Sequence, residues 1–598
     1  MGASIIPGRQ RVDRPSVIND SRFRFDSFEN GEVFPGKASQ KLPAMGWNSW
    51  NAFGSGNTEE LTKAMAERIV SLGLDKLGYR YVVLDDGCYK QERTEGLLSN
   101  DENKFPSGFR SLADHIHSMG LKFGMYNDIG TNLCAGAAVG TCGHERVDAR
   151  TYLEWGVDFI KVDNCYYPWD NATFSDSKNA GYTFAPNIKA IKITGKNTDI
   201  TISALNARII GEGASVKSDY VTGIGTFDGT GPEHSPVGLR SCELHFEVYA
   251  GDDGEYEISL LYATGAEEGM GKWLQMATAD QGVFFDDPMP ETDDSDDFVW
   301  SDPIKFFLHG GKNVVRIMNH RRQENTLCSY AALLEGFYEA DPKCDVLLSI
   351  CEWGKTQPQN WGYKVGNSWR ILNDITFQVG SDGDPGHGAW ESDYTTGVAV
   401  QYNKAVIMDE FAGLDRGWND PDMLMIGMDG LNIQMCATHF AMWCMMSAPL
   451  MLGLDLRNVK KGDDIYNIIA NEEIIALDQD PLGIQAKRVF TTYKTQNPDK
   501  EYIRDNNRVD VLAKPLSGGD IAVSFINLGS TVWNHEVSVE FDDIARMLKG
   551  KMPAEFAEHE SFRIKDLWSK NKSTINEKRL SVCDIPAYGN KTFRVSAG

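Results

Sequence analysis

Two stretches of this chain alternate short apolar runs with amphipathic helical segments, and this alternation constrains the fold more than any other feature. The first stretch, from about Leu42 to Cys165, predicts strands in AMGWNSW, YRYVVLDDG, LKFGMYNDIG and VDFIKVDN. The second predicts four more, in DVLLSICEWG, GNSWRILNDI, GWNDPDMLMIG and APLMLGLDL. Strands that alternate with helices favour a parallel sheet. Eight such units predict an α/β fold, a closed (β/α)8 TIM barrel.

The helices between these strands have recognisable ends. TEELTKAMAERIVSLGLDKLG begins after a Thr cap, and FRSLADHIHSMG ends in Gly. We predict that NIKAIKITG belongs to the fourth barrel helix. The segment DIYNIIANEEIIALDQD is predicted to be the last.

Two all-β segments accompany the barrel. ELHFEVYA, YEISLLYATG and NVVRIMNH have strand patterns and interrupt the alternation, which predicts an inserted β domain. Its segments resemble a β-sandwich of jelly-roll type. RVDVLAKPL, DIAVSFINL and KTFRVS predict a C-terminal antiparallel β-sandwich. The predicted domains are an N-terminal arm (1–40), two barrel halves (41–197 and 343–482), the insertion (198–342) and the C-terminal domain (483–598). An insertion between the fourth helix and the fifth strand is expected at the barrel's amino-terminal face, opposite the mouth.

Bulk composition excludes several classes of partner. The net charge of minus 26 argues against nucleic acid and anionic membranes, and no run of about 18 apolar residues could span a bilayer. The eleven cysteines lack zinc-type spacing, so we expect no metal and no cofactor. The opening residues lack the apolar core of a signal peptide, which leaves the cytoplasm or a mature exported form open.

Charged and aromatic residues follow the predicted strands, at the points where the strands end. They are Trp47, Asp85, Asp86, Tyr126, Asp128, Lys161, Asp163, Glu352, Arg370, Asp374, Asp420 and Asp422. In a TIM barrel the carboxyl ends of all strands meet at one mouth, where catalysis takes place. These residues therefore predict an active site.

Paired carboxylates beside aromatic residues suit cleavage of a glycosidic bond. Asp163 is the predicted nucleophile, and Lys161, two residues earlier on the same strand face, is expected to keep it ionised. Asp374 is the predicted acid.

A sugar also needs hydrogen-bond acceptors and a flat apolar wall. Asp85 and Asp86 are predicted to accept from its hydroxyl groups, which requires that the strand has already turned into a loop there. Trp47 and Trp353 are predicted to form the wall.

The motifs MGWNSWNAFG, LDDGCY, WGVDFIKVDNC, SICEWG, GNSWRILNDI and GWNDPDML stand in the order found in glycoside hydrolase family 27, which this chain resembles. The resemblance implies a retaining exo-glycosidase in which Asp163 is the nucleophile and Asp374 the acid and base. It also implies substrate contacts from Trp47, Asp85, Asp86, Tyr126, Lys161, Glu352 and Arg370, with Asp422 nearby.

Within the family, Glu352 favours an α-galactoside, because relatives that take a 2-acetamido sugar carry a small residue there. Asp85 and Asp86 favour a sugar with a C6 hydroxyl over a β-L-arabinopyranoside. Isomaltose-releasing dextran hydrolysis stays open. The alternative from another functional class is a carbohydrate-binding protein that has no enzymatic activity.

Three further features depend on the resemblance. Cys134 and Cys165 match a family disulfide beside the nucleophile, whose formation depends on the compartment. Residues 87–89 stand where many members have a tryptophan, so one pocket wall is expected to differ. The insertion resembles a carbohydrate-binding module, with a spacer or oligomerisation domain as the alternative. Assembly into a homo-oligomer is left open.

Overall fold

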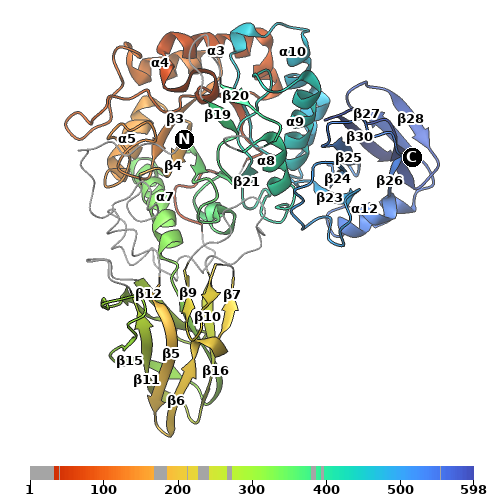
Figure 1. The fold of residues 1–598 in the computed structure, drawn as a ribbon. Helices are drawn as coiled ribbons and strands as arrows, with labels where there is room; N and C mark the ends of the chain where they lie inside the picture. The colour runs from red at the N-terminus through yellow and green to blue at the C-terminus, as the bar shows by residue number, and fades with distance from the viewer. Residues whose placement is uncertain are drawn as a thin grey trace.

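A computed structural model describes residues 33–39, 41–166, 185–211, 213–225, 242–264, 273–378, 386–391, 396–552 and 554–598. Three bodies are visible in Figure 1: a barrel with its helices, a β-sandwich that projects from it, and a second β domain beside α9 and α10. The predicted N-terminal arm lies mostly outside the described residues. Within the part of the chain that the structure describes, no helix is both long and apolar enough to cross a bilayer.

The barrel is a sheet of eight parallel strands, as predicted. Their order is β21-β18-β17-β4-β3-β2-β1-β22, and the ring closes where Leu424, just after β21, bridges Leu452 of β22. The strands are β1 (Met45–Asn48), β2 (Tyr81–Val83), β3 (Lys122–Asp128), β4 (Phe159–Asp163), β17 (Leu347–Cys351), β18 (Ser368–Arg370), β21 (Trp418–Asp420) and β22 (Leu450–Leu452).

The helices around the barrel begin and end at residues that suit helix termini. Thr58 caps α3 by accepting a hydrogen bond from the Leu61 amide, and Gly156 ends α5 in the left-handed conformation. After β17 the chain forms only 3-10 turns, at Pro358–Asn360 and Gly362–Lys364. The α-helices are α2 (Trp50–Phe53), α3 (Glu59–Leu72), α4 (Gly108–Ser118), α5 (Glu145–Trp155), α7 (Arg321–Ala340), α8 (Val398–Ala405), α9 (Ile433–Met446), α10 (Asp464–Ile469) and α11 (Glu472–Asp478).

Side chains fill the barrel interior in layers. Tyr81, Phe159, Leu347 and Met451 belong to one apolar cluster inside the ring of strands. The next inward position on β4 is Lys161, two residues after Phe159. The interior therefore changes from apolar to charged as the strands approach their carboxyl ends.

The insertion is a β-sandwich with its own apolar core. One sheet has the order β13-β12-β16-β10-β7, and the other has the order β14-β11-β5-β9-β8 with β6 and β15 added. The strands are β5 (Asn187–Gly195), β6 (Thr198–Ser203), β7 (Arg208–Ile210), β8 (Ser215–Val216), β9 (Val221–Thr222), β10 (Glu243–Ala250), β11 (Gly254–Ala263), β12 (Trp273–Thr278), β13 (Gly282–Pro288), β14 (Val299–Trp300), β15 (Ile304–Leu308) and β16 (Gly311–Met318).

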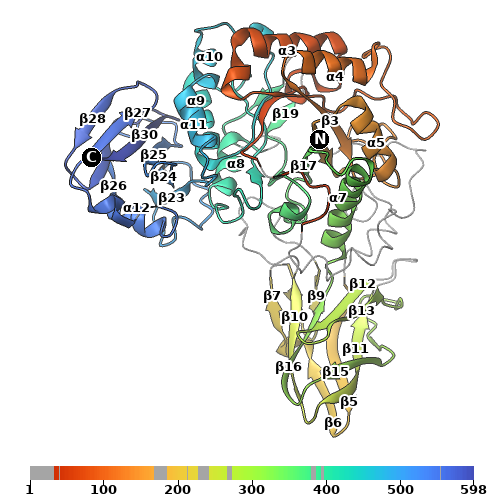
Figure 2. The same cartoon turned by 180° about the vertical axis from the view of Figure 1, so that it is seen from behind.

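The predicted place and bounds of the insertion are wrong. NIKAIKITG is strand β5, in which Ile188, Ile191 and Ile193 are buried in the sandwich core and pair with β11. The fourth barrel helix is α7, which follows the insertion; Figure 2 shows it between the barrel and the sandwich. Tyr330 of α7 donates a hydrogen bond of 2.9 Å to the Val162 carbonyl of β4. The sandwich thus interrupts a strand-to-helix connection, which lies at the mouth side of a TIM barrel.

The junction between the sandwich and α7 is polar and buried. Gln275 of β12 accepts a hydrogen bond from the His320 amide and donates to Glu324 in the first turn of α7. Glu243 of β10 forms ion pairs with Arg316 and His320. These contacts fix the sandwich to the helix that supports the nucleophile's strand.

The C-terminal domain is antiparallel, as predicted. One sheet has the order β23-β24-β25-β30-β27-β28, and β26 pairs with β29. The predicted last barrel helix is two helices, α10 and α11, because Asn471 between them caps α11 with its side chain. The domain's elements are β23 (Lys487–Thr491), β24 (Val509–Pro515), β25 (Ile521–Asn527), β26 (Val537–Glu540), α12 (Phe541–Met547), β27 (Phe562–Asp566), β28 (Lys572–Ile575), β29 (Arg579–Val582) and β30 (Asn590–Ala597).

Candidate active site

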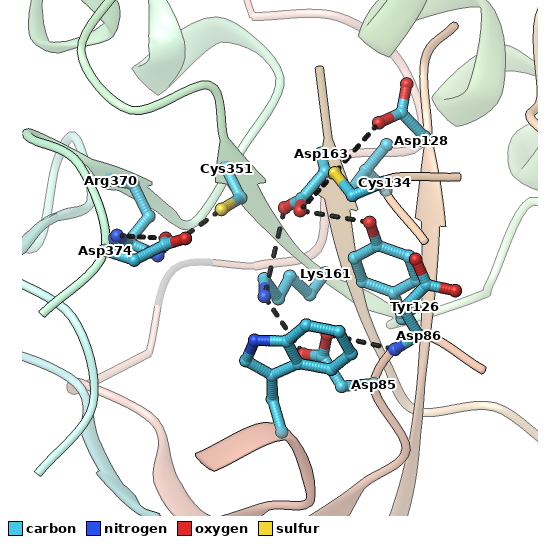
Figure 3. A network of polar contacts seen from close by, with 12 residues as sticks. Asp85, Asp86, Tyr126, Asp128, Cys134, Lys161, Asp163, Cys351, Arg370 and Asp374 are labelled. Carbon is cyan, nitrogen blue, oxygen red and sulfur yellow. Dashed lines mark hydrogen bonds and ion pairs between the residues drawn. The ribbon is translucent and has the colours of Figure 1, made fainter. Parts of the chain in front are cut away.

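Asp163, the last residue of β4, has two oxygens in different surroundings. Oδ2 accepts a hydrogen bond of 3.0 Å from the Tyr126 hydroxyl. Oδ1 is buried without a hydrogen-bond partner, and the Lys161 ammonium lies 3.9 Å from it. Figure 3 shows this carboxylate among Tyr126, Lys161 and Cys351. One oxygen is therefore held by the protein while the other is free to react.

Lys161 joins the nucleophile's strand to the predicted sugar-binding aspartates. Its ammonium lies 3.0 Å from Asp85 Oδ2, and it stands 5.3 Å above the Tyr126 ring. Asn48 at the end of β1 donates 2.8 Å to the same Asp85 oxygen. Sequence reasoning did not name Asn48, although its inward position on β1 was a usable signal.

Asp85 and Asp86 lie in the loop after β2, which ends at Val83, so the predicted turn is confirmed. Asp86 accepts hydrogen bonds of 2.6 Å from the amides of Gly87 and Ala135. Gly87 has a φ of +94°, and a Cβ there would lie 2.6 Å from Ser55 Cα, so only glycine fits. The loop conformation that carries both carboxylates is fixed by backbone contacts.

The Cys134–Cys165 disulfide lies against Asp163. The two residues are bonded with 5.3 Å between their Cα atoms, and Cys134 Sγ lies 3.3 Å from Asp163 Oδ2. Asp128 of β3 accepts 2.7 Å from the Cys165 amide and is fully buried. Burial and the charge of Asp163 raise the pKa of Asp128 to about 8. Asp128 thus holds the backbone that follows the nucleophile.

Asp374 lies across the site from Asp163, next to the cationic side chain of Arg370. Arg370 of β18 donates 2.9 Å to Asp374 Oδ1 and lies 2.7 Å from Asp422 Oδ2. The Trp353 indole donates 3.1 Å to Asp374. The Asp374 side chain is 47% exposed, whereas the Asp163 side chain is 8% exposed. Asp374 can therefore exchange protons with an incoming ligand or with solvent.

The pKa directions of the two carboxyls differ. Burial raises the pKa of Asp163 to about 6, and Lys161 only partly offsets this effect. Lys161 therefore favours the ionised form of Asp163 but does not outweigh burial. Partial desolvation raises the pKa of Asp374, but Arg370 and Lys161 outweigh it and hold the pKa below its usual value. When one of the two carboxyl groups is protonated, the proton is therefore mainly on Asp163 and not on Asp374.

The predicted sugar contact from Trp47 is wrong. Trp47 is fully buried, its indole donates 2.9 Å to the Leu454 carbonyl, and it packs on Phe53. Asn48 faces the interior, so its neighbour Trp47 faces the helices. Trp50, the first residue of α2, is only half-buried and packs against the barrel's interior cluster. Trp50, which follows β1, is thus partly accessible where Trp47 is not.

Glu352, a predicted sugar contact, faces Thr356 in this structure. Glu352 is fully buried and accepts hydrogen bonds from the amide and hydroxyl of Thr356. Cys351, one residue earlier, is in register with Asp163 and faces it. Cys351 Sγ lies 3.5 Å from Arg370 Nη1. Sequence reasoning did not name Cys351.

Two other predicted features have a supporting role. Tyr126 is fully buried, so it acts on Asp163 and not on a sugar. Tyr89, at the place where many family members have tryptophan, is buried and donates 2.7 Å to the Tyr126 carbonyl. Tyr126 thus contacts Asp163 inside the ring of strands, whereas Tyr89 supports Tyr126 from the helix side, packed on Phe109 and Trp155.

Known proteins resemble the chain over nearly its whole length. A family profile described as Alpha galactosidase A matches residues 42–203 and 351–480. A second, the Alpha galactosidase C-terminal beta sandwich domain, matches residues 506–595. Together the two profiles match more than half of the chain.

Individual relatives agree with these profiles. Alpha-galactosidase A of Cellvibrio japonicus is 25% identical over 93% of this chain and 92% of its own length. An α-galactosidase of Cyamopsis tetragonoloba is 27% identical over 92% of this chain and 86% of its own length. The structure of the Saccharomyces cerevisiae α-galactosidase with raffinose has a TM-score of 0.57 at 21% identity and covers 93% of this chain and 98% of its own. The chain belongs to glycoside hydrolase family 27, among the α-galactosidase-like hydrolases.

Proposed function

We propose that this enzyme releases terminal α-D-galactosyl residues from oligosaccharides, polysaccharides or glycoconjugates by a two-aspartate double displacement. The observation that carries the proposal is the buried Asp163 Oδ1, which has no hydrogen-bond partner while Tyr126 holds the other oxygen. Such a carboxylate can attack an anomeric carbon and form a glycosyl ester. Asp374, partly exposed across the site, protonates the leaving oxygen and later activates water.

The family relationship supports the galactoside. The relatives from Cellvibrio japonicus and Cyamopsis tetragonoloba are named α-galactosidases. The intact Asp85 and Asp86 provide acceptors for sugar hydroxyls, which supports a hexose over β-L-arabinopyranose. We also propose that the inserted sandwich is a carbohydrate-binding module, on the strength of its fold and resemblance.

A panel of nitrophenyl glycosides tests the substrate, and proton NMR of the first sugar released tests the stereochemistry. We expect the α-galactoside to be cleaved fastest and the α anomer to appear first. Activity confined to the α-N-acetylgalactosaminide or β-L-arabinopyranoside would overturn the choice of sugar.

The nucleophile is tested by Asp163→Asn, which should abolish turnover because an amide cannot form the ester. In a crystal structure we expect the two carboxyl groups roughly 5 to 5.5 Å apart, as in retaining enzymes. A first-formed β anomer, or a separation of about 8 Å, would indicate inversion.

A further inference from the structure

A chamber of about 30 Å³ lies inside the barrel, between the apolar interior layer and the carboxylates of the site. One part of its wall is apolar, with Phe159, Met423, Pro449 and Met451, and the other part carries Asn48, Lys161, Ser349, Ser368, Arg370 and Asp420. A space of about 10 to 15 Å³ suffices for one water molecule, which the polar part of the wall can hydrogen-bond. The chamber is therefore suited to water and lies directly behind the site.

Arg370 has one donor that no protein atom satisfies. Its terminal nitrogens contact Asp374, Asp422 and the Leu372 carbonyl. Its Nε is buried and has no hydrogen-bond partner. A buried guanidinium N–H needs an acceptor, and a water in the chamber can provide one.

Asp420 is placed to hold such a water. It is in register with Arg370 on the neighbouring parallel strand, so the two side chains lie on the same face of the sheet. Oδ1 of Asp420 accepts 2.9 Å from the Asp422 amide. Its carboxylate also lines the chamber that Arg370 and Lys161 share. Asp420 thus shares the chamber with two buried cations, one of which carries the unsatisfied donor.

We propose that Asp420 is a positioning residue of the catalytic site. Arg370 Nε donates to a chamber water, that water donates to Asp420, and the guanidinium is thereby held against Asp374 and Asp422. The orientation of Arg370 in turn fixes the side chain and the proton affinity of the acid. This inference rests on the proposed function, because it assigns a role in the leaving-group step.

The test compares Asp420→Asn with the unaltered enzyme on two α-galactosides. Methyl α-galactoside needs protonation by Asp374, whereas dinitrophenyl α-galactoside leaves without it. We expect kcat/KM to fall about 10²-fold on the methyl galactoside and much less on the dinitrophenyl galactoside. The acid limb of the pH profile on the methyl galactoside should also move to lower pH, because Arg370 loses a neutralising neighbour and lowers the pKa of Asp374, which is the lower of the two carboxyl pKa values. Equal losses on both substrates with an unchanged pH profile would overturn the proposal.

A second variant tests the water itself. Ser349→Val places an apolar group in the chamber and leaves Asp420 intact, so it should reproduce the selective loss on the methyl galactoside. A normal ratio between the two substrates would refute the water-mediated contact. The matched control is Asp114→Asn on α4, whose side chain is 56% exposed and which should behave as unaltered enzyme.

Melting followed by circular dichroism verifies that each variant folds. If the unaltered enzyme cleaves no α-galactoside, the proposed function fails, and the inference is then decided by a crystal structure. An ordered water between Arg370 Nε and Asp420 supports the contact, and its absence refutes it.

Discussion

The variant Tyr126→Phe removes the hydrogen bond that the Tyr126 hydroxyl donates to Asp163 and leaves the ring in place. The Tyr126 hydroxyl donates 3.0 Å to Asp163 Oδ2, and both groups are buried. A hydrogen bond to a charged acceptor contributes roughly 1.5 to 3 kcal/mol. One pKa unit corresponds to about 1.36 kcal/mol, so loss of this bond should raise the pKa of Asp163 by roughly one to two units.

The direction of the expected shift in the pH profile follows from the proposed role of Asp163, which must be ionised to attack. In the unaltered enzyme kcat/KM should fall as the pH drops through about 6, the pKa of Asp163. In Tyr126→Phe this acid limb should lie about one to two units higher. At pH 5 the variant should therefore be about 10- to 100-fold slower, because the ionised fraction falls tenfold per unit. Above the shifted limb the difference should largely disappear.

The assay is kcat/KM for dinitrophenyl α-galactoside from pH 4 to 9, since this substrate does not depend on the acid. Tyr89→Phe is the matched control, because its hydroxyl contacts the Tyr126 carbonyl and not Asp163. A uniform loss at every pH, with the acid limb in its original place, would refute the electrostatic argument and leave only a packing defect.

Three further outcomes are expected. Asp374→Ala should accumulate glycosyl enzyme on an activated galactoside, and azide should restore turnover as a galactosyl azide; rescue of Asp163→Ala instead would reverse the two roles. Trp50→Ala should raise KM with little change in melting, whereas Trp47→Ala should cost about 3 to 5 kcal/mol of unfolding free energy in a denaturant titration; equal effects on KM would contradict the assignment. Replacing residues 185–319 by a short Gly and Ser linker should leave a folded barrel by circular dichroism, but replacing 198–342 should not, because the second deletion removes α7. Hydrolysis of polymeric galactosides should fall in the first deletion more than hydrolysis of a nitrophenyl galactoside, and an unchanged ratio would argue against a binding module.

The sequence predicted most of the barrel because its signals are local. Each strand is a short apolar run, and α3 and α5 carry their caps and left-handed glycines within the same segment. Polar residues directly after such runs could be assigned to one mouth, since all strands of a TIM barrel point the same way. Asp163 and Asp374 could be singled out on that basis without coordinates.

The fourth helix shows where local signals are insufficient. NIKAIKITG is short, and a short apolar run fits a strand or a helix equally well by periodicity. Its pairing with β11, nearly seventy residues further on, decides for the strand. That single assignment moved the insertion from one end of the barrel to the other.

At the site, the chain alone determined which segments supply the chemistry, and only the tertiary structure decided which side chains of those segments face it. Trp47 and Glu352 belong to the right motifs but face the helices and Thr356. Neighbouring residues at a strand end can face opposite sides, and the direction depends on register with strands distant in sequence. The pKa of Asp163 likewise depends on burial by the whole barrel, which outweighs the nearby Lys161. Identity and order of motifs are local properties, whereas direction, burial and charge balance are properties of the assembled fold.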